Sequence, residues 1–175
     1  METKGAGKTE TALFLKRKIG VVKRFSGDLR GALEAYKEIV QIHVQTNTDN
    51  TENCANLHMN IGNMHSELSE YDEACQSYDK SFGIRKNLNK LETDKGALLL
   101  TNMGAVQGKM KNFQSAIEKF DEAERIRNMT GTTDSPDGAF LMDNIAYVYS
   151  EQHNFDAAKM KYIEARKLIT LRLNR

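Results

Sequence analysis

One feature of the sequence limits its fold more than any other: a segment of helical character recurs at a fixed interval of 42 residues. The clearest copies start at residues 60, 102 and 144, and a weaker copy starts at residue 18. They read NIGNMHSELSEYDEACQSYDKS, NMGAVQGKMKNFQSAIEKFDEA, NIAYVYSEQHNFDAAKMKYIEA and KIGVVKRFSGDLRGALEAYKEI. One copy is too short to bury its own apolar face, so neighbouring copies must stack and share a core.

Small and large side chains stay in register across the four copies. The small columns are Gly20, Gly62, Gly104 and Ala146, and Ala32, Ala74, Ala116 and Ala158. The large columns are Tyr36, Tyr78, Phe120 and Tyr162, and Leu29, Tyr71, Phe113 and Phe155. A small residue lets two helix backbones approach closely, and a ring one turn further along fills the adjoining space. Apolar residues at helical spacing lie on both sides of a polar break in each copy, which predicts a helix hairpin.

These patterns predict an all-α solenoid of about four stacked hairpins, since no alternation of period two indicates a strand. We expect a flexible polar leader over residues 1–11 and a repeat domain over 12–175. The repeats are expected at roughly 12–53, 54–95, 96–137 and 138–175. Three polar, turn-prone segments are expected to connect the hairpins, at 45–54, 87–96 and 129–138, with Pro136 inside the last of them.

Composition narrows the class of protein further. The chain has 175 residues, of which 39% are hydrophobic and 28% are charged, and these values suit one soluble folded domain. A formal net charge of +1 gives no reason to expect nucleic acid or a membrane as the main partner. Cys54 and Cys75 are the only cysteines, and the apolar run at 12–15 is too short for a signal sequence or a membrane span. A cytoplasmic protein is therefore expected.

The shared small and aromatic columns resemble the fingerprint of tetratricopeptide repeat (TPR) proteins, over roughly residues 12–173. The usual period is about 34 residues, and the longer period here is similar to that of kinesin light chains and nephrocystin-like proteins. The repeated Ile-Arg pairs at 84–85 and 126–127, followed by DSPDGA at 134–139, resemble kinesin light chain repeats. The resemblance implies a right-handed superhelix, in which the first helix of each hairpin lines a concave groove for an extended peptide or a partner helix.

A stripe of asparagines marks the expected groove. Asn56, Asn60 and Asn63 share one face of the first helix of the second repeat, and asparagine recurs at 42-residue intervals as Asn60, Asn102 and Asn144. Each amide offers both a donor and an acceptor to peptide main chain, and Asn at this place commonly contacts the bound peptide in the long-repeat proteins that the chain resembles. The candidate groove residues are Asn56, Asn60, Asn63, Asn102, Asn144, Tyr147, Lys109, Arg17 and Arg24. The two arginines would attract an acidic end of the ligand. The alternative is that the amides bridge adjacent helices or face water.

Residue types argue against an enzyme. The segment GAGKT at 5–9 resembles a phosphate-binding loop, but Glu2 stands where that motif needs glycine and no strand precedes it. Four residues could be considered as zinc ligands, namely Cys54, His58, His65 and Cys75. Their spacing does not match known zinc sites, so we expect them to be packing residues. No catalytic triad signature appears, and we expect neither a metal nor a cofactor.

Two specific binding modes are also disfavoured. Chaperone-binding TPR domains hold a terminal carboxylate through basic residues, but Met59, Phe140 and Asn144 stand at the places where cations are needed. RNA binding needs a continuous basic track, whereas the basic cluster belongs to one repeat and consists of Lys16, Arg17, Lys18, Lys23 and Arg24.

The expected function is therefore a non-enzymatic scaffold that binds an extended peptide or a helix of a partner protein in its concave groove. The alternative is a structural or self-associating module, or a fragment of a longer array, that docks through its C-terminal helix. That expected helix carries Ile163, Leu168, Ile169 and Leu171, and no polar capping helix follows it in the sequence.

Overall fold

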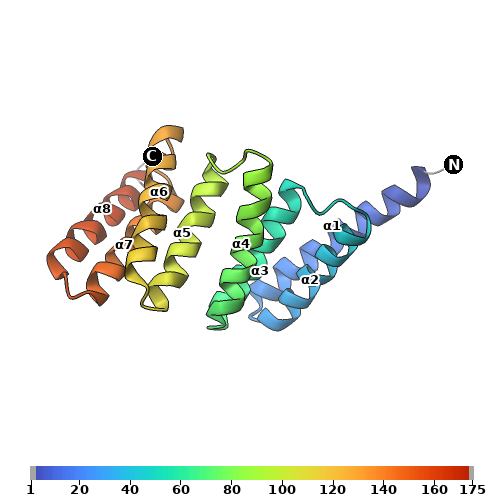
Figure 1. The fold of residues 1–175 in the computed structure, drawn as a ribbon, viewed down its shortest axis with the longest axis horizontal. Coiled ribbons are helices and arrows are strands. Elements are labelled where there is room, and N and C mark those ends of the chain that lie inside the picture. Colours follow the sequence, from blue (N-terminus) through green and yellow to red (C-terminus); the bar gives the residue numbers. More distant parts are fainter. Residues whose placement is uncertain (1–2, 174–175) are drawn as a thin grey trace. The chain divides into compact units, whose positions relative to one another are not determined.

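The computed structural model describes residues 3–173, with side chains from 11 to 170, and its regular structure there is helical throughout (Figure 1). The eight helices of this part are α1 (Thr3–Phe25), α2 (Leu29–Gln45), α3 (Glu52–Glu67), α4 (Tyr71–Asn87), α5 (Asp94–Lys109), α6 (Phe113–Thr130), α7 (Pro136–Glu151) and α8 (Phe155–Leu173). No strand occurs between residues 3 and 173, so the expected all-α solenoid of helix hairpins is confirmed.

The chain divides into two compact units, Met1–Ile84 and Arg85–Arg175. In the first unit, α1 packs against α2 and α2 packs against α3, and Oγ of Ser81 in α4 donates to the Ala55 carbonyl in α3 at 2.7 Å. In the second unit, α5 packs against α6 and α7 packs against α8, while α7 also contacts both α5 and α6. Within each unit, the later hairpin therefore covers one face of the earlier hairpin.

A recurring cap fixes the start of the first helix in three hairpins. Thr51, Thr93 and Ser135 have extended backbones, and their hydroxyls accept hydrogen bonds from the N–H groups three residues further on. Each cap satisfies an N–H group that has no partner within the helix. Pro136 does not lie in the connection as the sequence predicted; it is the first residue of α7, where the missing N–H breaks no helical hydrogen bond.

Left-handed residues recur at the same positions of each hairpin. Within the hairpin turns they are Gly27, Ser69, Lys111 and His153. Between hairpins they are Asn47, Asn89 and Gly131. The polar breaks in the sequence are therefore short turns in which one residue adopts the left-handed conformation that ends a helix. The turns within the four hairpins, at 26–28, 68–70, 110–112 and 152–154, have one length.

The small columns let aromatic rings lie directly against the backbone of the facing helix. Three pairs show this contact: Tyr36 with Gly20, Tyr78 with Gly62, and Phe120 with Gly104. A Cβ atom added at Gly62 would lie 2.5 Å from Cε1 of Tyr78, which is closer than two carbon atoms can pack. The interlocking of small and large positions that the columns predicted is therefore confirmed in three of the four repeats.

The core of the first unit forms where the second helix of one hairpin meets the first helix of the next. It contains Ala32, Leu33, Tyr36 and Ile39 from α2, and Leu57, Ile61 and Met64 from α3. Complete burial of one Leu, Ile or Met side chain stabilises a fold by about 1.5–3 kcal/mol. Most of this apolar surface would face water in an isolated hairpin, so stacking is what makes the fold stable.

A buried arginine of α6 contacts the residues that start α7. Arg127 is 1% exposed, its Nη1 atom donates to Oγ of Ser135 at 3.5 Å, and its Nη2 atom lies 3.9 Å from Oδ2 of Asp137. Burial lowers the pKa of this guanidinium, and the nearby carboxylates of Asp137 and Asp94 oppose that effect. Arg85 is fully buried as well, so both arginines of the repeated Ile-Arg pairs are core residues.

Helix α1 begins earlier than the sequence led us to expect. A flexible leader was expected over residues 1–11, whereas residues 3–11 belong to α1. The segment GAGKT at 5–9 therefore lies within a helix, not in a phosphate-binding loop after a strand. Glycine and proline are the two residue types that disfavour helices most. Residues 3–11 contain glycine but no proline, and the other residues there permit a helix. Residues 1 and 2 lie outside the described part.

Replacing Gly62 by alanine tests the contact between ring and backbone. The added methyl group would overlap the Tyr78 ring, and overpacking costs about 1–3 kcal/mol, which outweighs the gain in helix propensity of roughly 1 kcal/mol at most. We expect Gly62→Ala to lower the free energy of unfolding measured in urea. Gly83→Ala is the matched control, because no atom lies within 4 Å of a Cβ added there in α4, and alanine should stabilise that helix by about 0.5–1 kcal/mol. An increase in stability with both substitutions would contradict this account.

Candidate functional site

In the first unit, the asparagine stripe lies along α3. Asn56, Asn60 and Asn63 are all partly exposed, and they follow the spacing of one helical face. The cap at Thr51 fixes the start of this helix through a hydrogen bond from the Cys54 N–H at 3.3 Å. The stripe is therefore carried by a helix whose first turn and inner face are both held in place.

Asn63 has a structural role in addition to its place in the stripe. Its Oδ1 atom accepts a hydrogen bond of 2.8 Å from the hydroxyl of Tyr78 in α4. Burial is the main cause that raises the pKa of Tyr78, with further contributions from Cys75 and Glu67, so the hydroxyl keeps its proton and remains a donor. The Asn63 amide therefore bridges α3 and α4.

In the second unit, the equivalent residues lie on α5 and α7, which contact each other. Asn102 and Asn144 are partly exposed, and Nδ2 of Asn144 donates to the Phe140 carbonyl one turn earlier at 2.7 Å. This bond orients the Asn144 amide. Phe140 is 43% exposed and Tyr147 is 37% exposed, so two aromatic side chains flank the amide. Lys109 is exposed in the last turn of α5.

The two candidate arginines of α1 have different surroundings. Nη2 of Arg24 donates to Oε1 of Glu67 at 2.7 Å, so this cation is already engaged within the chain. The guanidinium of Arg17 lies over the Phe14 ring, 5.9 Å from its centroid. Arg17 also lines a pocket of about 220 Å³, together with Leu13, Phe14, Ile39, His43, Asn53 and Leu57. Sequence reasoning missed this pocket, which three helices build, although the neighbouring apolar residues Leu13 and Phe14 were a signal for it.

The residues considered as zinc ligands are engaged in other ways. Cys54 is buried, and this burial raises the pKa of its thiol. Nδ1 of the buried His65 lies 2.6 Å from Oε2 of Glu70, and the bond to His65 is the main cause that lowers the pKa of that carboxyl. Among the residues that the structure describes, no group of three or more His, Cys, Asp or Glu side chains could hold a metal ion.

None of the helices within residues 3–173 combines the length and the apolar composition that crossing a bilayer requires.

Two segments of the chain match known sequence families. Residues 55–88 and residues 96–170 match two families that are both described as tetratricopeptide repeat, and together the segments make up more than half of the chain. No curated protein matches the sequence.

Solved structures share the fold at low sequence identity. BtubC (BKLC) from P. vanneervenii is 16% identical with a TM-score of 0.80, over 93% of this chain and 65% of that one. This chain thus spans less than two thirds of BtubC. A Podosopora anserina protein described as a kinesin light chain with nearly identical TPR-like repeats is 13% identical with a TM-score of 0.73, over 93% and 77% of the two chains. MamA is 16% identical with a TM-score of 0.65, over 98% and 86%. The fold is therefore similar to that of kinesin light chain repeats, as the sequence predicted.

A double-mutant cycle tests the bridge between α3 and α4. Asn63→Ala removes the acceptor of the buried Tyr78 hydroxyl, and an unsatisfied buried donor costs about 1–3 kcal/mol. We expect Asn63→Ala to be much less destabilising in a Tyr78→Phe background, where the hydroxyl is absent. The measurement is the free energy of unfolding of the four proteins in urea. Equal costs of Asn63→Ala in both backgrounds would show that the hydrogen bond contributes nothing.

His58 should make the stability of the fold depend on pH. Burial is the main cause that lowers its pKa from the ordinary value of 6.5, and Lys80 lowers it further, while Asp49 has the opposite effect. A lowered folded pKa means that the unfolded chain binds the proton more readily, so stability is present above pH 6.5 and is lost as the pH falls below that value. We expect the wild type to lose more unfolding free energy than His58→Gln between pH 7.5 and 5.5. Identical losses in the two proteins would exclude this contribution.

Proposed function

Because the chain belongs to the tetratricopeptide repeat family, whose domains commonly serve as protein-interaction scaffolds, we propose that it binds an extended segment or a helix of a partner protein. The ligand contacts the first helices of the hairpins, through the asparagine stripe of α3 in one unit and the asparagines of α5 and α7 in the other. The proposal assigns Asn60, Asn102 and Asn144 as the central contacts.

The recurrence of asparagine at one position of the repeat carries the proposal. In the interior of a helix, Asn is less favourable than Ala by up to about 0.7 kcal/mol, and three helices accept this cost at the same register. All three side chains are partly exposed, so burial does not explain them. An amide suits peptide main chain because it can donate to a carbonyl and accept from an N–H. Such contacts tolerate many ligand sequences.

Apolar surroundings supply preference for particular ligand side chains. In the first unit, the pocket beside Arg17 and Phe14 is also lined by the buried side chains of Ile39 and Leu57. It suits an apolar ligand side chain that has a carboxylate next to it, because Arg17 lines the same pocket. In the second unit, the exposed rings of Phe140 and Tyr147 suit flat or apolar side chains. Arg24 contributes less than the sequence suggested, since Glu67 already pairs with it.

Ion pairs within the first unit disfavour a nucleic-acid partner. Cations of α1 pair with carboxylates of the same unit: Lys16 with Glu38, Lys23 with Asp28, and Arg24 with Glu67. Paired cations release fewer counterions on binding a phosphate backbone, so they add little affinity for RNA. The proposed scaffold acts without a catalytic group or a cofactor. Cys54 and Cys75 do not form a disulfide, which agrees with the proposed cytoplasmic location.

A pull-down from cytosolic lysate with mass spectrometry tests the proposal. The immobilised proteins are the wild type, the triple variant Asn60→Ala/Asn102→Ala/Asn144→Ala, and the matched control Gln41→Ala/Gln76→Ala/Gln114→Ala. The control removes three exposed amides from the second helices α2, α4 and α6. Circular dichroism first confirms that all three proteins are folded, which we expect because each substitution raises helix propensity.

We expect a set of partners to bind the wild type and the glutamine variant and to be lost from the asparagine variant. Three hydrogen bonds of about 0.5–1.5 kcal/mol each correspond to a weakening of roughly tenfold or more for an isolated partner. Equal recovery by the wild type and the asparagine variant would refute the proposed stripe.

A further inference from the structure

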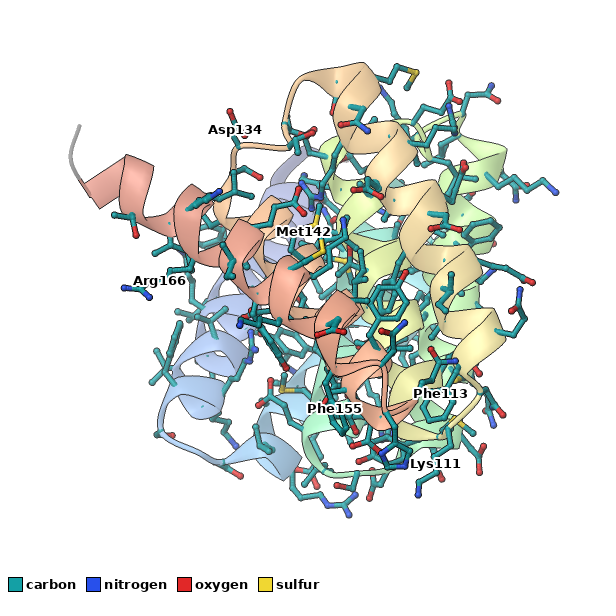
Figure 2. The ribbon with its side chains drawn as sticks, turned by 90° about the vertical axis from the view of Figure 1, so that its left-hand side faces the viewer. Lys111, Phe113, Asp134, Met142, Phe155 and Arg166 are labelled. Carbon is teal, nitrogen blue, oxygen red and sulfur yellow. The ribbon has the colours of Figure 1, made fainter. Side chains whose placement is uncertain are left out.

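Helix α8 presents an apolar groove on its outer side. The groove is lined by Phe155, Ala158, Lys159, Tyr162, Ile163 and Arg166, with Ser150 of α7 at its edge and a volume of about 400 Å³. A second hollow, lined by Ile163, Arg166, Lys167 and Thr170, extends it along the helix. Phe155 is 63% exposed and Ile163 is 45% exposed. Figure 2 looks onto α8 and shows Arg166 extending outward from the helix, while Met142 lies on its inner side. We call this surface the α8 groove.

The preceding hairpin of the same unit shows what fits a surface of this kind. Phe113, Ala116 and Phe120 of α6 occupy the positions 42 residues before Phe155, Ala158 and Tyr162. That hairpin is covered by a helix, because α7 packs against both α5 and α6. The contact is close: a Cβ added at Gly108 in α5 would lie 2.8 Å from Cγ2 of Val148 in α7. The ring of Phe120 in the covered hairpin is 1% exposed, whereas that of Tyr162 in α8 is 44% exposed. A helix is therefore the element that the groove is shaped to receive.

The charge of the α8 groove differs from that of the equivalent surface of α6. The position 42 residues before Arg166 is Glu124, whose Oε1 atom lies 3.4 Å from Nζ of Lys161 in α8. Glu124 of α6 thus pairs with a cation of α8, whereas the α8 groove itself has a cation at the equivalent position. Lys159 and Lys167 add two more cations along the groove, and no carboxylate is among the residues that line it. Glu164 of α8 pairs with Lys161, at 3.3 Å.

We propose that the α8 groove docks an amphipathic helix of a partner protein whose apolar face is flanked by Asp and Glu residues. The apolar face covers Phe155, Tyr162 and Ile163, and the carboxylates pair with Lys159, Arg166 and Lys167. A second copy of this chain is a poor occupant, because pairing two α8 grooves would bring their cations together. This surface belongs to α8, whereas the asparagine stripe belongs to first helices, so the two docking sites are separate.

The test uses a labelled peptide with the sequence of residues 136–151, which is the helix that covers the equivalent surface inside the unit. This segment contains Asp137, Asp143 and Glu151 and has no Lys or Arg. A second peptide carries lysine at those three positions. Fluorescence anisotropy with the full 175-residue chain measures the binding of both peptides. Analytical ultracentrifugation of the chain alone measures self-association.

We expect the acidic peptide to bind the wild type at least about tenfold more tightly than the basic peptide does. Lys159→Glu/Arg166→Glu should reverse that order. Ile163→Asp should abolish binding, and Met160→Asp should leave it unchanged, because Met160 is 72% exposed on α8 but does not line the groove. The triple asparagine variant should bind the acidic peptide as the wild type does, which separates this proposal from the one above.

Three results would overturn the proposal. The first is equal binding of the two peptides, which would mean that charge does not select the occupant. The second is an Ile163→Asp variant that binds the acidic peptide normally, which would place the contact elsewhere. The third is a wild-type dimer that Ile163→Asp converts to monomer, which would show that a second copy covers the groove.

Discussion

The fold depends on the contact between an aromatic ring and the bare backbone of the helix that faces it. Tyr78 against Gly62 and Phe120 against Gly104 fix how closely the two helices of a hairpin approach. A ring in direct contact with backbone leaves no room for the helices to slide, so the outer face of each second helix has a defined shape. That face receives the next hairpin, as the core between α2 and α3 illustrates.

The same contact connects the scaffold to the candidate binding surface. The hydroxyl of Tyr78 bonds to Asn63 at 2.8 Å, so the ring that sets the hairpin spacing also holds one amide of the stripe. Asn144 is held in a different way, by the Phe140 carbonyl of its own helix. Amides that are already oriented lose less conformational entropy when a ligand binds. Asn63 and Asn144 are thus each oriented within their own unit, although different partners hold them.

Features that repeat could be predicted from the sequence, whereas features formed by single long-range contacts could not. The period of 42 residues predicted the hairpins, their polar turns and the ring contacts, because the same small and large residues recur in every copy. The ion pair between Arg24 and Glu67 joins residues 43 apart that belong to no repeated column. The pocket around Phe14 depends on three helices meeting. The early start of α1 could not be predicted from the repeat, because residues 3–11 precede the first repeated segment.

The most direct test of the proposed binding surface is an NMR titration that follows side-chain amide signals. A partner peptide recovered with the wild-type chain is added to ¹⁵N-labelled protein, and the NH₂ signals of Asn and Gln residues are compared. Our account predicts that the signals of Asn60, Asn102 and Asn144 shift with a common dissociation constant, while those of Gln41, Gln76 and Gln114 stay in place. Shifts confined to the glutamines of the second helices would contradict it, because the ligand would then lie on the other face of the hairpins.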